Sequence, residues 1–111
     1  MIFVDFLGSS ADFESLKDGV AEEIAAALRS SRSGVVVRRF VIDPAPSEIE
    51  LWVELSSDEQ FVRYGRNIAE RVAERIRAES ATDVWVMFRI VPLSHAFLNG
   101  QPRARGRATL D

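Results

Sequence analysis

The chain has 111 residues, of which 47% are apolar and 28% charged, with a net charge of −3. These values indicate one soluble globular domain and disfavour a nucleic-acid binder, which needs a basic surface. The absence of cysteine excludes disulfides and thiolate chemistry, and a lone histidine excludes a multi-histidine metal site within one chain. No phosphate loop, nucleophile elbow or dinucleotide fingerprint is present, so neither a metal nor a cofactor is expected.

The opening MIFVDFLG is too short for a secretory leader and lacks a basic first region. No stretch approaches 18 apolar residues, the length that would predict a membrane span. We therefore expect a cytoplasmic protein with no membrane association.

Hydrophobic periodicity predicts six elements in chain order. Alternating apolar residues indicate strands, and apolar residues at three- and four-residue steps indicate helices. Ser9 and Ser57 precede the helices as N-caps, and Gln60 completes a capping box with Ser57. The expected elements are a strand at 2–7, a helix over 12–29, strands at 35–42 and 49–55, a helix over 58–78 and a strand at 84–91.

The two halves of the chain repeat one another. Asp5 matches Glu54, 49 positions later, and Phe13 matches Phe61, 48 positions later. A β-α-β unit is thus duplicated, in pseudo-repeats 1–46 and 47–100, and an internal repeat of this kind constrains a fold strongly. The fold class is α+β: one domain over 1–111, with a four-stranded mixed sheet and both helices on one face.

The two faces of this sheet differ in composition. One face is purely apolar and should lie under the helices. The other mixes charges with Phe3, Trp52 and Trp85, and such apolar patches usually mark an interface. We expect other subunits to cover this second face, although an exposed face with stray aromatics is the alternative.

The duplicated unit resembles the tautomerase superfamily. The longer members with two fused β-α-β units, of the macrophage migration inhibitory factor and 5-(carboxymethyl)-2-hydroxymuconate isomerase type, are the most similar. The resemblance is strongest over 64–101, YGRNIAERVAERIRAESATDVWVMFRIVPLSHAFLNGQ. It implies a homotrimer with active sites between subunits, close to the amino terminus. A strand beginning at the first residue fits a terminus that forms part of a pocket.

The chain departs from this superfamily at its first residues. The superfamily's chemistry depends on an amino-terminal proline whose secondary amine is a general base or acid. Here Ile2 follows Met1, so no proline can be exposed. The primary amine of Met1 is a weaker substitute that could still act as a base or form an imine.

Other candidate site residues lie in a strand and in the segment after the last strand. Arg38 and Arg39 stand mid-strand, and a guanidinium matches a substrate carboxylate. The repeat matches Arg38 to Met87, which places Arg38 on the second face of the sheet. An ion pair with Asp5, Glu50 or Glu54 on that face is an equally good interpretation. The same two interpretations apply to Arg89.

His95 is a second candidate for proton transfer, although a lone loop histidine more often makes a structural hydrogen bond. Phe97 resembles the superfamily's aromatic residue before Asn-Gly, which walls the pocket, and simple packing of the hairpin is the alternative. Asn99-Gly100 predicts a C-terminal hairpin. The arm 101–111 carries Arg103, Arg105 and Arg107, which could meet a neighbour's acidic surface or an anionic ligand.

Three functions fit this pattern. The first is a divergent isomerase-like enzyme acting on a small 2-oxo or enol carboxylate, with Arg38 binding the carboxylate and Met1 or His95 moving the proton. The second is a non-catalytic trimeric member that binds a small anionic ligand or supports assembly. The third is a ferredoxin-like binding domain, since its β-α-β-β-α-β order is the same, although the repeat and the terminal hairpin speak against it.

Overall fold

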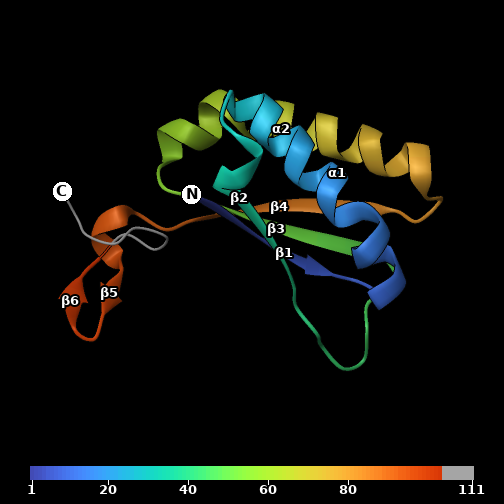
Figure 1. The fold of residues 1–111 in the computed structure, drawn as a ribbon, viewed down its shortest axis with the longest axis horizontal. Coiled ribbons are helices and arrows are strands. Elements are labelled where there is room, and N and C mark those ends of the chain that lie inside the picture. The colour runs from blue at the N-terminus through green and yellow to red at the C-terminus, as the bar shows by residue number, and fades with distance from the viewer. Residues whose placement is uncertain (104–111) are drawn as a thin grey trace.

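The computed structural model describes residues 1–103, and the part of the C-terminal arm with Arg105 and Arg107 lies outside the described residues. Two helices cover one face of a four-stranded sheet, as Figure 1 shows. A small hairpin, β5–β6, projects from one end of the molecule. The sheet strands are β1 (Ile2–Leu7), β2 (Val35–Arg39), β3 (Ile49–Leu55) and β4 (Val84–Ile90); the helices are α1 (Ser10–Leu28) and α2 (Asp58–Glu79); the hairpin strands are β5 (Phe97–Leu98) and β6 (Gln101–Pro102); and short 3-10 turns span Arg32–Gly34 and Leu93–His95.

The strand order is β2-β1-β3-β4. Each helix connects two parallel neighbours, β1 with β2 and β3 with β4, while β1 and β3 run antiparallel at the centre. The predicted duplication and fold class are therefore confirmed. A ferredoxin-like domain has a split β-α-β unit, with another strand between its two parallel strands, and this pairing differs from it.

The core lies between the sheet and the helices. The apolar strand face packs against one side of each helix, with Leu16, Val20 and Ile24 of α1 and Ile68 and Val72 of α2 buried. Side chains at three- and four-residue steps share one face of a helix, which is why these positions meet the sheet. The expectation that the first apolar face lies under the helices is confirmed.

Both helices begin at their predicted serine caps. The hydroxyl of Ser9 accepts from the Asp12 amide, and that of Ser57 accepts from the Gln60 amide. In the predicted capping box, the Gln60 side chain would accept a hydrogen bond from the Ser57 amide. The structure does not contain this bond. The Gln60 side chain accepts instead from the amide and hydroxyl of Ser56, one residue earlier. This still satisfies an amide at the start of the helix.

The strand after α1 ends earlier than predicted, at Arg39 rather than at residue 42. Its partner β1 ends at Leu7, and the last bond between them joins the Phe40 amide to the Phe6 carbonyl. Val41 and Ile42 therefore extend beyond the sheet, and both are exposed. The hairpin forms where predicted, and the positive φ angles of Asn99 (53°) and Gly100 (80°) are those of a two-residue hairpin turn.

Candidate functional site

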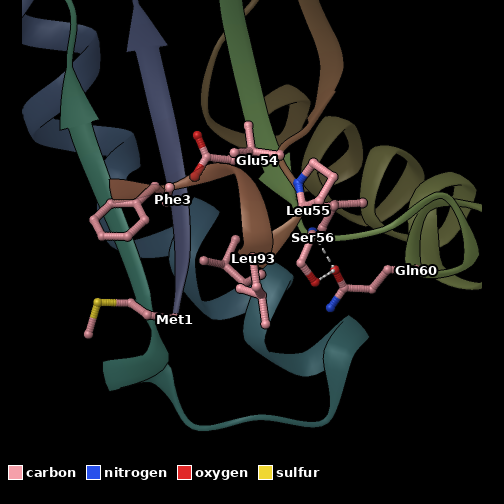
Figure 2. Close-up of a pocket in the computed structure, with 11 residues that line it drawn as sticks. Met1, Phe3, Glu54, Leu55, Ser56, Gln60 and Leu93 are labelled. Carbon is pink, nitrogen blue, oxygen red and sulfur yellow. Dashed lines mark hydrogen bonds between the residues drawn. The ribbon is translucent and has the colours of Figure 1, made fainter. Parts of the chain in front are cut away.

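A cavity of about 310 Å³ opens at the first residue of the chain. The sheet topology creates it. Because β1 runs antiparallel to β3, the start of β1 lies beside the end of β3, and β4 ends at the same edge because it runs parallel to β3. Figure 2 shows Met1 just before β1, Phe3 in β1, Glu54 and Leu55 in β3, and Leu93 in the segment after β4 around this cavity.

The cavity combines apolar and polar surface in similar proportions. Ile2, Leu55, Val91, Pro92 and Ala96 contribute apolar surface. Polar groups come from the end of β3 and the start of α2, where Ser56 and Gln60 are hydrogen-bonded to one another. Glu54 adds a half-buried carboxylate. A cavity that combines apolar surface with a few convergent polar groups can hold a small molecule, and its volume suits a small ligand.

The predicted site residues divide between this cavity and its surroundings. Met1 lines the cavity, with 58% of its surface exposed. His95 does not line it, although its near neighbours Leu93 and Ala96 do; its side chain is exposed, and its amide donates to the Pro92 carbonyl. Phe97 lies next to Ala96 but points largely into solvent, 63% exposed, on the hairpin.

Arg38 lies on the second face of the sheet, outside the cavity. Its guanidinium donates to Asp5 at 2.9 Å and lies over the Phe3 ring, 5.1 Å from the centroid. Arg89 donates to the other oxygen of the same carboxylate and lies over the Trp52 ring. Within the single chain, Arg38 and Arg89 thus both pair with an acidic strand residue, which is one of the two interpretations given to them. Arg39 is exposed.

Asp5 is the charged residue that the fold buries most completely among those described, with 4% of its surface exposed. Burial by itself would raise the pKa of this carboxyl. The hydrogen bonds from Arg89 and Arg38, together with their positive charges, outweigh burial and hold the pKa of Asp5 below its usual value. The carboxylate thus stays charged and joins β1 to β2 and β4.

Sequence reasoning missed Glu54, Gln60 and Leu93 as cavity residues. These residues lie near Met1 because β1 pairs antiparallel with β3. No short sequence motif encodes this pairing. The position of Glu54 at the end of a strand, just before the Ser57 cap, is the signal that could have indicated it. Within residues 1–103 there is no group of three or more His, Asp or Glu residues that could hold a metal ion.

No family model and no curated protein sequence matches the chain. Solved structures do. A protein of unknown function from Vibrio cholerae superposes with a TM-score of 0.71 at 18% identity, covering 91% of this chain and 86% of that one. A fused 4-OT wild-type asymmetric trimer gives 0.68 at 16% identity, covering 95% and 99%. Macrophage migration inhibitory factor of Toxoplasma gondii gives 0.56 at 13% identity, covering 88% and 95%.

These neighbours share one fold with the chain over almost its whole described length. The four-stranded mixed sheet with two helices on one face is the fold that the chain shares with these structures, among them the 4-OT trimer and macrophage migration inhibitory factor. The expected resemblance is confirmed at the level of the fold.

Among the described residues, neither helix is long and apolar enough to cross a membrane.

Proposed function

We propose that this tautomerase-fold chain acts as a homotrimer and that its cavity at Met1 binds a small 2-oxo or enol carboxylate and moves a proton on it. The observation that carries the proposal is the position of Met1. This residue lines a cavity with both apolar and polar surface, at the end of the sheet where β1 begins and β3 and β4 end. The trimeric 4-OT neighbour supports the oligomeric state.

The proposed chemistry is an isomerisation that needs no outside reactant. The Met1 amine takes the proton of the enol hydroxyl and returns a proton to the adjacent carbon, so that the keto form is produced. Val91 and Leu93 are among the apolar residues that line the cavity in which this transfer would occur. His95, two residues after Leu93, is the second candidate for moving the proton.

A substrate carboxylate needs a cationic partner. No arginine among the described residues lines the cavity of the single chain. Arg38 is held by Asp5, and Arg39 is exposed at the end of β2. We assign carboxylate binding to these arginines across a subunit boundary, because sites in such trimers lie between subunits. Phe97, exposed on the hairpin, forms an aromatic wall of the same site.

A second candidate function is non-catalytic binding of the same class of ligand. One observation favours it: the residue after Met1 is Ile2, where the resemblance implies a proline. In that case the cavity and the trimer are kept while turnover is lost.

Ketonisation of phenylenolpyruvate and 2-hydroxymuconate, followed by ultraviolet absorbance, tests the proposal. Intact-mass spectrometry first establishes that the purified protein begins at Met1. Slow turnover that saturates with substrate, and that falls at least tenfold in a Leu93→Arg variant, supports the enzyme. Saturable binding without turnover supports the second candidate, and neither turnover nor binding contradicts both.

The missing base can be tested separately. Inserting a proline between Met1 and Ile2, in a protein whose initiator methionine is removed, supplies the secondary amine. A rate that rises with proline but not with an inserted alanine indicates a cavity able to use the stronger base. Equal rates with the two insertions contradict the assignment of the terminal amine as the proton carrier.

A further inference from the structure

Two hydrogen bonds fix the orientation of the Gln60 side-chain amide, which lies in the wall of the cavity at Met1. Its oxygen accepts from the Ser56 amide at 2.9 Å and from the Ser56 hydroxyl at 3.1 Å. A backbone amide can only donate, so the atom that faces Ser56 must be the oxygen. The nitrogen, Nε2, therefore lies on the other side of the amide group.

This nitrogen carries two N–H donors that the chain itself does not use. Within residues 1–103, Gln60 Nε2 donates no hydrogen bond, whereas the oxygen of the same amide accepts two. Figure 2 shows both bonds from Ser56 ending on the oxygen, with the nitrogen beside it. Gln60 is half-buried, so its donors are held in place and remain accessible to a ligand in the cavity.

The pair of Ser56 and Gln60 belongs to the cavity wall as well as to the start of α2. A glutamine three residues after a serine cap usually accepts from the amide of the cap residue itself. Here it accepts from Ser56, and both Ser56 and Gln60 line the cavity, while the cap residue Ser57 does not. The bonds to Ser56 thus connect the Gln60 amide to the end of β3.

The charges around the cavity indicate where a negative ligand oxygen can lie. Glu54 contributes a carboxylate from β3, and a second negative charge beside it is disfavoured. Among the described residues that line the cavity, Gln60 is the one with side-chain N–H donors. An oxygen that becomes negative in this cavity is therefore stabilised best at Gln60 Nε2.

We propose that Gln60 is a catalytic residue whose Nε2 donates a hydrogen bond to the ligand oxygen that becomes negative during proton transfer. The inference rests on the proposed function and assigns its oxyanion donor. When the Met1 amine removes the proton of the enol hydroxyl, the electrons of the O–H bond stay on the oxygen, and an enolate forms. A proton from the Met1 ammonium then adds to the adjacent carbon. The electrons of the C=C bond form the new C–H bond, and an oxygen lone pair completes the C=O bond.

Ser56 is a positioning residue in this step. Its two hydrogen bonds hold the Gln60 amide before the reaction begins. A donor that is already oriented stabilises a developing oxyanion without reorganising, which is why fixed amide donors are effective in catalysis. The rigidity supplied by Ser56 and the donor supplied by Gln60 are therefore separable by mutation.

Gln60→Glu removes the donors while keeping the fold. A glutamate oxygen still accepts both bonds from Ser56, and an acidic side chain in the first turn of a helix is stabilising. Asn67→Asp is the matched control, because it makes the same change of amide to carboxylate at an exposed position of α2 outside the cavity. We expect kcat for ketonisation of phenylenolpyruvate to fall by about 100-fold in Gln60→Glu, and Asn67→Asp should leave it unchanged.

A neutral variant separates loss of the donor from repulsion of the substrate. Gln60→Met has a similar length but neither charge nor N–H donors. It should lower kcat as much as Gln60→Glu does, whereas KM should rise mainly in Gln60→Glu. Ser56→Ala keeps the backbone bond to Gln60 and loses the hydroxyl bond, so it should lower kcat by a smaller factor with little change in KM. Circular dichroism and urea unfolding confirm that each variant is folded.

The outcomes distinguish this inference from the proposed function. Turnover that is the same in Gln60→Met and in the natural chain would overturn the donor role and leave the proposed function standing. A loss confined to Gln60→Glu would indicate charge repulsion and would also overturn the donor role. Binding without turnover by the natural chain would overturn the catalytic role of Gln60 together with the enzyme, while the second candidate function would stand. Absence of both binding and turnover would contradict all three.

Discussion

Arg89 on β4 reaches across β3 to the carboxylate of Asp5 on β1, two strands away. Arg38 approaches the same carboxylate from β2, so one buried acid links three strands of the sheet. Both guanidiniums lie over aromatic rings, Phe3 and Trp52, which adds a cation–π attraction to each pair. The second sheet face is therefore organised around Asp5 rather than being a surface of independent charges.

Replacing Asp5 by Asn should destabilise the protein by about 1.5–3 kcal/mol, the usual contribution of hydrogen bonds to charged groups. The variant leaves two guanidiniums facing each other without their shared carboxylate. Urea unfolding followed by circular dichroism measures the change. Asp18→Asn is the matched control, because Asp18 pairs with Arg32 at an exposed position and should cost under about 1 kcal/mol. Equal losses in the two variants would contradict the role given to Asp5.

The same carboxylate predicts a dependence of stability on pH. The pKa of Asp5 is lower in the folded chain than in the unfolded chain, so its stabilisation is fully present above the ordinary carboxyl pKa of about 3.9. It is lost as the pH falls through the lowered value. Unfolding free energies of the natural chain and of Asp5→Asn should therefore converge as the pH drops below about 4. A difference that is constant with pH would show that Asp5 contributes no charge-dependent stability.

Removing Arg89 tests whether the bridge across β3 matters separately from the pair with Arg38. Arg89→Ala leaves the buried carboxylate with one cation and uncovers one face of Trp52. We expect lower stability by about 1–2 kcal/mol, since a charged hydrogen bond is lost at a half-exposed site, and a change in tryptophan fluorescence. Arg39→Ala, at an exposed side chain at the end of β2 on the opposite edge of the sheet, is the control and should change neither reading.

The duplicated β-α-β unit made the fold predictable, because each half dictates one helix between two parallel strands. The apolar alternation correctly placed Val4, Leu51 and Val53 under the helices. The alternation did not predict where β2 ends, because the length of a strand depends on the strand with which it pairs. Val41 and Ile42 are as suited to a strand as Val37, but β1 ends at Leu7 and offers them no backbone groups to pair with.

Only those parts of the candidate site that lie within a single strand or segment could be predicted from the sequence. Met1 became a candidate because the resemblance implies a site at the amino terminus, and a cavity does open there. The contribution of Glu54 and Gln60 depends on how β3 aligns with β1, which is set by pairing between distant segments. Arg38 could be placed on the correct face from strand alternation, but its choice of Asp5 over Glu50 or Glu54 required the actual register.

Gly19 provides a prediction in which two effects of opposite sign compete. Glycine within α1 costs about 1 kcal/mol relative to alanine, yet Arg75 of α2 lies across it. A Cβ at position 19 would stand 3.1 Å from the Arg75 Nε and 3.2 Å from its Cζ. The guanidinium would have to move by a few tenths of an ångström and weaken its pairs with Glu23 and Glu79.

Gly19→Ala alone should therefore change stability little, because the gain in helix propensity is offset by the strained Arg75 pairs. In an Arg75→Ala background the same substitution should stabilise the protein by about 1 kcal/mol. The coupling energy from this double-mutant cycle, measured by urea unfolding, should be about 0.5–1 kcal/mol. Identical effects of Gly19→Ala in the two backgrounds would show that Arg75 does not constrain this position, and that the glycine is retained for another reason.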